Sequence, residues 1–196
     1  QFSIADFLKN QGYKTAMIGK WHLGIGWQTL PNKQKVTPRK KLVNHPKAKP
    51  GIGKGWNYDY SKAITGPASF GFDYFWGVGA SLDMPPYVYL ENDKVLGNPD
   101  ICKAFNRRPG PATEDFDASQ TLIHLARKSR QYIAQQTENE PFFLYLPLTS
   151  PHTPVSPSKT WQGKSSIGPY GDFLMETDWV VGEVLAELER QKFPAP

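Results

Sequence analysis

Two short apolar runs, separated by stretches with helical periodicity, constrain the fold of this chain more than any other feature. The first run is Lys14–Gly19, with Ala16, Met17 and Ile18 as its body, and the second is Phe142–Leu148. Each has the length of a buried strand. Helical patterns lie before and between these runs and after the second, and strands that alternate with helices favour a parallel sheet. We therefore expect an α/β fold in which helices flank a mostly parallel sheet.

Capping residues and apolar periodicity predict three helices, over residues 3–10, 111–136 and 170–191. Ser3 can cap the first, and Pro111 and Thr113 open the second. Between the first strand and about Gly110 we expect irregular chain with one short strand over 87–90. The expected buried faces are Ile4, Phe7 and Leu8 in the first helix, Leu122, Leu125, Ala126, Ser129 and Ile133 in the second, and Leu174, Val181, Val184, Leu185 and Leu188 in the third.

Polar residues with catalytic potential follow both apolar runs. Lys20 and His22 come after the first run, and His152 comes after the second between Pro151 and Pro154. Ligands of open α/β sheets bind beyond the carboxyl ends of the strands, so these three residues can converge. Alternate side chains of a strand share a face, so Lys20 and His22 are expected to point the same way. Such a pair suits an anionic ester, because the lysine holds charge while the histidine moves a proton.

Each of these residues also has a plainer interpretation. A Lys-x-His triplet is common and can simply end a strand, and His152 can lie in a proline-rich turn by chance. We expect His124 to be an ordinary helix-surface residue and His45 to be a loop residue. The aromatic residues of the segment 71–85 (GFDYFWGVGASLDMP) are expected to be core residues rather than ligand contacts.

The longer segments around these residues resemble the type I sulfatases. Residues 12–24 (GYKTAMIGKWHLG) resemble the second signature of that family, and 141–154 (PFFLYLPLTSPHTP) resemble its strand followed by P-H-x-P. Residues 58–66 and 71–85 also fit the family, in the same order along the chain. The resemblance implies an alkaline-phosphatase-like fold. It further implies that Lys20 holds the sulfate or the hydrate oxygen, that His22 is the base of the second step, and that His152 assists the leaving group. In some sulfatases the serine that matches Ser81 lies near the sulfate.

The resemblance also implies cofactors whose residues this sequence lacks. Type I sulfatases use a formylglycine made within C/S-x-P-S-R and hold calcium with Asp-Asp and Asp-Asn pairs. Neither dipeptide occurs here, and the only cysteine, Cys102, lies in I-C-K-A-F; Ser156 and Ser158 do not fit the motif either. We therefore interpret residues 1–196 as a partial catalytic domain that is inactive alone, with surface loops or insertions over 24–70 and 91–110. A formylglycine-generating or sulfatase-maturing enzyme would modify the parent protein.

Composition is consistent with this interpretation. The chain has 196 residues, enough for one domain, and 39% hydrophobic residues, which argues against disorder. No apolar stretch is long enough to span a membrane. The formal charge is +5, and much of the excess lies in residues 33–54. That basic run either attracts a polyanion such as a sulfated glycan or is an ordinary solvated loop. It lacks interleaved aromatic residues, so no nucleic-acid partner is expected.

Three functions remain open from the sequence. The first is hydrolysis of sulfate esters, of an aryl or a carbohydrate substrate, in the intact parent protein. The second is hydrolysis of phosphonate or phosphate esters, because that branch of the superfamily shares much of the pattern over residues 12–22. The third is a non-catalytic protein that binds sulfated glycans. The resemblance implies a secreted, periplasmic or lysosomal location.

Overall fold

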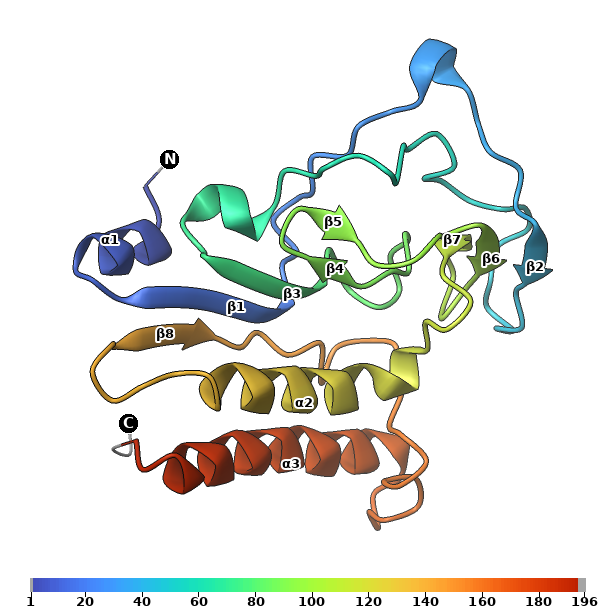
Figure 1. Ribbon diagram of the computed structural model, residues 1–196. Coiled ribbons are helices and arrows are strands. Elements are labelled where there is room, and N and C mark those ends of the chain that lie inside the picture. The colour runs from blue at the N-terminus through green and yellow to red at the C-terminus, as the bar shows by residue number, and fades with distance from the viewer. Residues whose placement is uncertain (1, 194–196) are drawn as a thin grey trace.

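The computed structural model describes residues 2–193 and contains a five-stranded sheet beside a smaller three-stranded sheet (Figure 1). The larger sheet has the order β5-β4-β3-β1-β8 and the smaller has the order β2-β6-β7. The strands are β1 (Lys14–Lys20), β2 (Lys40–Leu42), β3 (Tyr74–Val78), β4 (Leu90–Glu91), β5 (Lys94–Val95), β6 (Ile101–Lys103), β7 (Gly110–Ala112) and β8 (Phe142–Tyr145). The helices are α1 (Ile4–Asn10), α2 (Thr121–Ile133) and α3 (Pro169–Arg190), with short 3-10 turns η1 (Pro31–Lys33), η2 (Pro67–Phe70) and η3 (Ala118–Gln120).

Strand β1 is the centre of the larger sheet. It pairs in parallel with β3 on one side and with β8 on the other, so that Ala16 lies opposite both Tyr74 and Leu144. The five residues from Thr15 to Gly19 are buried, as expected for a strand covered on both faces. The predicted parallel α/β sheet is therefore confirmed. The hairpin of β4 and β5 adds an antiparallel edge beyond β3.

The two faces of the sheet build two separate hydrophobic clusters. Met17 and Phe75 belong to the cluster beside α1, whereas their neighbours Ile18 and Trp76 belong to the cluster beside α2. This division follows from the strand geometry, since successive side chains point to opposite faces. Burial of each such side chain contributes about 1.5–3 kcal/mol. The aromatic residues predicted to be core, Phe72, Tyr74, Phe75 and Trp76, do pack in these clusters.

The helices cover the sheet in layers. Figure 1 shows α2 beneath the sheet, α3 beneath α2, and α1 on the opposite side. Ser3 caps α1 as predicted: its hydroxyl accepts the Asp6 N–H at 3.0 Å, and the Asp6 carboxylate accepts the Ser3 N–H at 2.9 Å. The predicted face of α2 is confirmed, because all five of its residues are buried.

The stretch between β1 and α2 is more regular than the sequence indicated. It contains β3, a central parallel partner of β1, as well as the whole of the small sheet. Pro111 does not open a helix; it lies in β7, opposite Cys102 of β6, and α2 begins only at Thr121. Antiparallel pairing with β6 has overridden the local helix signal of Pro111 and Thr113 at this place.

The predicted buried faces of the outer helices are wrong. On α1 the side chains of Ile4 and Phe7 are exposed. On α3 the expected stripe is at the surface, with Leu174, Val181 and Leu185 exposed. The side of α3 that is buried carries Gly171, Asp172, Phe173, Glu176, Val180 and Glu187. Both helices carry apolar residues on more than one side, so periodicity alone did not identify the side that packs.

Candidate active site at the carboxyl edge of the sheet

Three segments meet where the parallel strands end. The Lys20 N–H, at the last residue of β1, donates to the Pro147 carbonyl at 2.8 Å. The next N–H, that of Trp21, donates to the Val78 carbonyl at 3.0 Å. The chain that follows β1 is thereby joined on one side to the end of β3 and on the other to the segment that leads to His152. The backbone beyond the ends of β1, β3 and β8 is thus joined by hydrogen bonds.

Two glycines make this close approach possible. A Cβ atom on Gly77 would lie 1.8 Å from the Gly19 carbonyl oxygen, and one on Gly19 would lie 2.2 Å from the Pro147 carbonyl oxygen. Both distances are far inside van der Waals contact, so a side chain at either position requires the strands to separate. Glycine therefore sets the spacing of the three segments that carry the candidate residues.

His22 and Ser81 are brought together by this edge although they lie 59 residues apart. The Ser81 Oγ atom lies 3.0 Å from His22 Nδ1. Ser81 is buried and His22 is exposed, while the His22 N–H donates to the Gly79 carbonyl at 3.1 Å. The hydroxyl fixes the imidazole through Nδ1 and leaves Nε2 for another partner. A serine hydroxyl both donates and accepts, so it can hold either neutral tautomer.

The strand argument for Lys20 and His22 does not hold beyond Lys20. β1 ends at that residue, and His22 has a φ of 55°, which is not strand geometry. Lys20 is half-buried and Trp21, between the two, is buried with its indole N–H donating to the Gly24 carbonyl at 2.6 Å. The buried Trp21 anchors the turn, and this turn rather than strand alternation positions His22.

His152 lies in an exposed loop after β8. Its Nδ1 atom is 2.6 Å from the Thr153 carbonyl oxygen, so Nδ1 carries a proton and donates it, and Nε2 is left for another partner. The loop is tied to α3, since Thr177 Oγ1 lies 2.7 Å from Ser150 Oγ. Within residues 2–193, no hydrogen bond joins the His152 side chain to Lys20 or His22. The common cleft predicted for these three side chains therefore stays a prediction.

Comparison with known proteins identifies the family of this chain. The Sulfatase family profile matches residues 1–194. The chain belongs to the sulfatase family. It is 28% identical to N-acetylgalactosamine-6-O-sulfatase of Bacteroides thetaiotaomicron over 95% of the chain and 39% of that protein. It is 36% identical to human arylsulfatase H over 97% of the chain and 38% of that protein.

Solved sulfatase structures have the same fold. A Bacteroides thetaiotaomicron protein, solved in work on glycosaminoglycan metabolism, superposes with a TM-score of 0.73 at 25% identity, covering 97% of this chain and 42% of that one. A sulfatase of Pseudoalteromonas sp. gives 0.61 at 22% identity, covering 97% and 35%. The alkaline-phosphatase-like fold expected from the sequence is confirmed. The chain spans about two fifths of the length of the curated sulfatases it matches.

The described residues do not fit the cofactors that the sulfatase family implies. Within residues 2–193, no three His, Cys, Asp or Glu side chains cluster so as to hold a metal ion. Cys102 lies buried in β6 with its thiol directed at the Ile52 carbonyl at 3.6 Å, and burial raises its pKa. A buried thiol of raised pKa is the opposite of an activated nucleophile. No helix of the described chain is long and apolar enough to cross a membrane.

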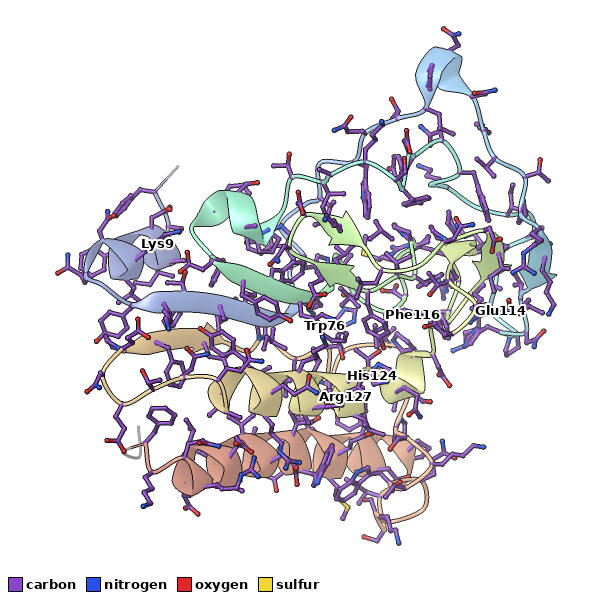
Figure 2. All side chains as sticks on the ribbon, viewed as in Figure 1. Lys9, Trp76, Glu114, Phe116, His124 and Arg127 are labelled. Carbon is purple, nitrogen blue, oxygen red and sulfur yellow. The ribbon has the colours of Figure 1, made fainter. Side chains whose placement is uncertain are left out.

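The structure shows the surroundings of the two other histidines. His45 lies in the loop after β2, as predicted, and its Nδ1 accepts the Lys47 N–H at 3.2 Å. His124 is not an ordinary surface residue: its ring is half-buried and lies 5.3 Å from that of Tyr89 and 6.3 Å from that of Trp76 (Figure 2). Burial lowers the pKa of His124. Its position in the aromatic core between α2 and the sheet is structural.

A cavity of about 910 Å³ opens beside the loop of His152. Thr153–Ser156 form one wall, and the loops after β2 and β6 form the other. Lys103 reaches into this region, where its ammonium donates to the carbonyls of Glu114 and Phe116 at 2.6 and 2.7 Å. This cavity could not be predicted from the sequence, because its walls come from segments that lie far apart along the chain.

Proposed function

We propose that these residues form one part of the active site of a sulfuric ester hydrolase, within a longer parent protein. The observation that carries the proposal is the carboxyl edge of the sheet. There the hydrogen bond between Ser81 and His22, the end of β1 at Lys20 and the loop of His152 are held by three contiguous strands. The family of the chain supports sulfate as the ester.

The proposed roles are those that the resemblance to sulfatases implies, and each suits the chemistry of its side chain. The Lys20 ammonium offsets negative charge on the sulfate oxygens as the ester bond breaks. His22, fixed through Nδ1 by Ser81, accepts a proton at Nε2. His152 donates a proton to the departing ester oxygen, and such a transfer typically contributes about 10²–10⁴-fold to the rate. We assign the nucleophile and the metal to no residue of this chain.

Either an aryl or a carbohydrate sulfate suits the proposal. Relatives of the chain are named as an N-acetylgalactosamine-6-O-sulfatase and as arylsulfatases. A carbohydrate alcohol is a poor leaving group and therefore needs the proton from His152 more than a nitrophenol does. The dependence on the leaving group thus tests the proposed acid directly.

The experiment uses the full-length parent protein and a series of sulfate esters with leaving groups from nitrophenol to a sugar alcohol. His152→Ala should reduce turnover of the sugar sulfate about 100-fold or more and that of the nitrophenyl ester only a few-fold. Thermal melting establishes that the variant is folded. Equal fractional losses across the series would contradict the acid role. Faster hydrolysis of the matched phosphonate or phosphate esters than of the sulfates would contradict the choice of sulfate.

A further inference from the structure

The basic run of residues 33–54 divides into two groups with different surroundings. Arg39 is neutralised by ion pairs to Asp100 at 2.8 Å and to Glu114 at 2.9 Å, and Lys40 lies 3.5 Å from Glu114 (Figure 2 labels Glu114). Lys49 and Lys54 take part in no ion pair among the described residues. The first group therefore stabilises the small sheet, and the second is available to a ligand.

Lys49 and Lys54 share a cavity with two further cations that lie outside the basic run. The cavity has a volume of about 500 Å³. Of its four cations only Arg108 has an ion pair among the described residues, at 3.3 Å to Asp83. The charge of the cavity is thus strongly positive. Its lining includes Lys49, Lys54, Tyr58, Met84, Pro85, Arg107 and Arg108.

The backbone around the cavity is held by close contacts. The Lys49 N–H donates to the Arg107 carbonyl at 2.9 Å, which joins the two cationic segments. Gly53, with a φ of +73°, lies so close to the next segment that a Cβ atom there would be 1.7 Å from the Pro109 carbonyl oxygen. The four cations are therefore carried on segments that are already ordered, which lowers the entropic cost of binding.

One wall of the cavity is joined through the backbone to the turn that carries Ser81. The Met84 N–H donates to the Ser81 carbonyl at 2.8 Å, and Met84 and Pro85 line the cavity. Asp83, in the same turn, holds Arg108, and the Tyr87 hydroxyl donates to the Arg108 carbonyl. Four residues of extended chain span at most about 14 Å, so the cavity begins within that distance of Ser81. A short oligosaccharide can reach from one to the other.

We propose that this cavity binds a second anionic group, a sulfate or a carboxylate, of an oligosaccharide whose scissile sulfate lies at His22. Arginine and lysine supply charge-assisted hydrogen bonds to such a group. Tyr58, whose ring stacks on Trp27 at 5.5 Å between centroids, offers a fixed aromatic edge to a sugar ring. The inference rests on the proposed sulfatase function and narrows its substrate to glycans with more than one negative charge.

The test compares two triple variants of equal charge in the full-length parent protein. The first is Lys49→Ala, Lys54→Ala and Arg107→Ala, and the control is Lys62→Ala, Lys94→Ala and Lys192→Ala. For a disulfated oligosaccharide, the first variant should raise KM about tenfold and change kcat less than twofold. For a nitrophenyl sulfate neither variant should differ from the wild type. The rise in KM should shrink at high salt, because these cations are exposed.

A binding measurement separates this inference from the proposed function. Calorimetry of the 196-residue chain with the disulfated oligosaccharide should show binding that the first variant loses and the control keeps, even if no sulfatase activity is found. An equal loss in both variants would overturn the cavity as the site. A single-stranded oligonucleotide of the same charge that binds as tightly would overturn the choice of a glycan.

Discussion

Ser81 is buried in the fold, yet its hydroxyl lies 3.0 Å from the Nδ1 atom of the exposed His22. In the proposed reaction the Ser81 hydroxyl contacts none of the atoms whose bonds form or break, so we regard Ser81 as a positioning residue. Its effect is exerted through the orientation of the imidazole and the tautomer that it carries. Small errors in the position of a reacting group are costly, because rates depend steeply on geometry.

We expect Ser81→Ala to lower kcat for a nitrophenyl sulfate about tenfold in the full-length protein, with KM little changed, because His22 loses its partner at Nδ1. Ser81→Thr, which keeps a hydroxyl, should restore most of the rate. Steady-state kinetics on the two folded variants make the comparison. An alanine variant with the wild-type kcat would show that the hydrogen bond is only structural.

At the scale of elements, the carboxyl edge depends on glycines in two neighbouring strands. Gly77→Ala in β3 should destabilise the protein by about 3 kcal/mol or more, because the new methyl group would meet the Gly19 carbonyl. Gly182→Ala in α3 is the matched control: nothing lies within 4 Å of its Cβ position, and the change should stabilise by about 0.5–1 kcal/mol. Urea unfolding measures both. A Gly77→Ala variant with an unchanged free energy of unfolding would disprove the close approach of Gly77 to the Gly19 carbonyl.

The first half of α3 contains two buried carboxylates whose pKa values are shifted in opposite directions. Asp172 accepts the Ser165 N–H at 2.7 Å and the Gly163 N–H at 2.8 Å, and these bonds lower its pKa. Glu176 is fully buried with Oε1 unpaired, and burial raises its pKa above the ordinary 4.5, even though Oε2 accepts the Ser158 N–H. The ionised Asp172 therefore favours folding, whereas the ionised Glu176 opposes it.

The two groups should give opposite responses to pH. Below pH 4.5 the Glu176 carboxyl is protonated and its burial carries no ionisation cost. As pH rises through its folded pKa, the free energy of unfolding falls. Glu176→Gln should remove this loss and stabilise the protein by about 1 kcal/mol at pH 8. Asp172→Asn should lower the melting temperature at neutral pH and matter less below pH 3.8, where the unfolded carboxyl is already protonated. Melting curves from pH 3 to 8 distinguish them. A Glu176→Gln protein that melts earlier at pH 8 would contradict this account.

Local patterns predicted β1, the approximate ends of α3 and the buried face of α2. β1 follows from its apolar run, and the position of α3 and the buried face of α2 follow from helical periodicity. β3 was missed although its three aromatic residues suit a strand, since Tyr74–Val78 contains an internal glycine and is flanked by turn-forming glycines. The buried side of α3 was missed because it carries three carboxylates beside Phe173 and Val180, and is therefore less apolar than the stripe that periodicity favoured.

For the candidate site, the residues could be predicted from the sequence, whereas the contacts between them could be found only in the structure. Lys20, His22 and His152 follow from their positions after strands, together with the longer family segments. The hydrogen bond from Ser81 to His22 spans 59 residues, and no periodicity links them. Arg107 and Arg108 were missed as partners of Lys49 and Lys54 because a backbone hydrogen bond between distant loops brings them together.

At the scale of the whole molecule, the catalytic groups of a sulfatase are only partly present among the described residues. We expect the 196-residue chain alone to show no hydrolysis of a nitrophenyl sulfate and no calcium binding at micromolar concentrations. Calcium needs about six to eight converging oxygen ligands, and residues 2–193 contain no acidic cluster of that kind. Calorimetry with calcium, with and without a chelator, measures this. Micromolar binding would place a metal site within this chain.

The position of β8 has a practical consequence for the isolated chain. Among the described residues β8 pairs only with β1, so its other edge presents free N–H and C=O groups, and Tyr145 beside it is 47% exposed. Open strand edges of this kind template intermolecular pairing. Tyr145→Lys should delay aggregation at high concentration, as seen by light scattering, whereas Ile167→Lys, at a loop position that is 73% exposed, should not. If both act alike, general hydrophobicity rather than the strand edge governs solubility. Otherwise β8 is the place where concentrated solutions of this chain begin to form intermolecular sheet.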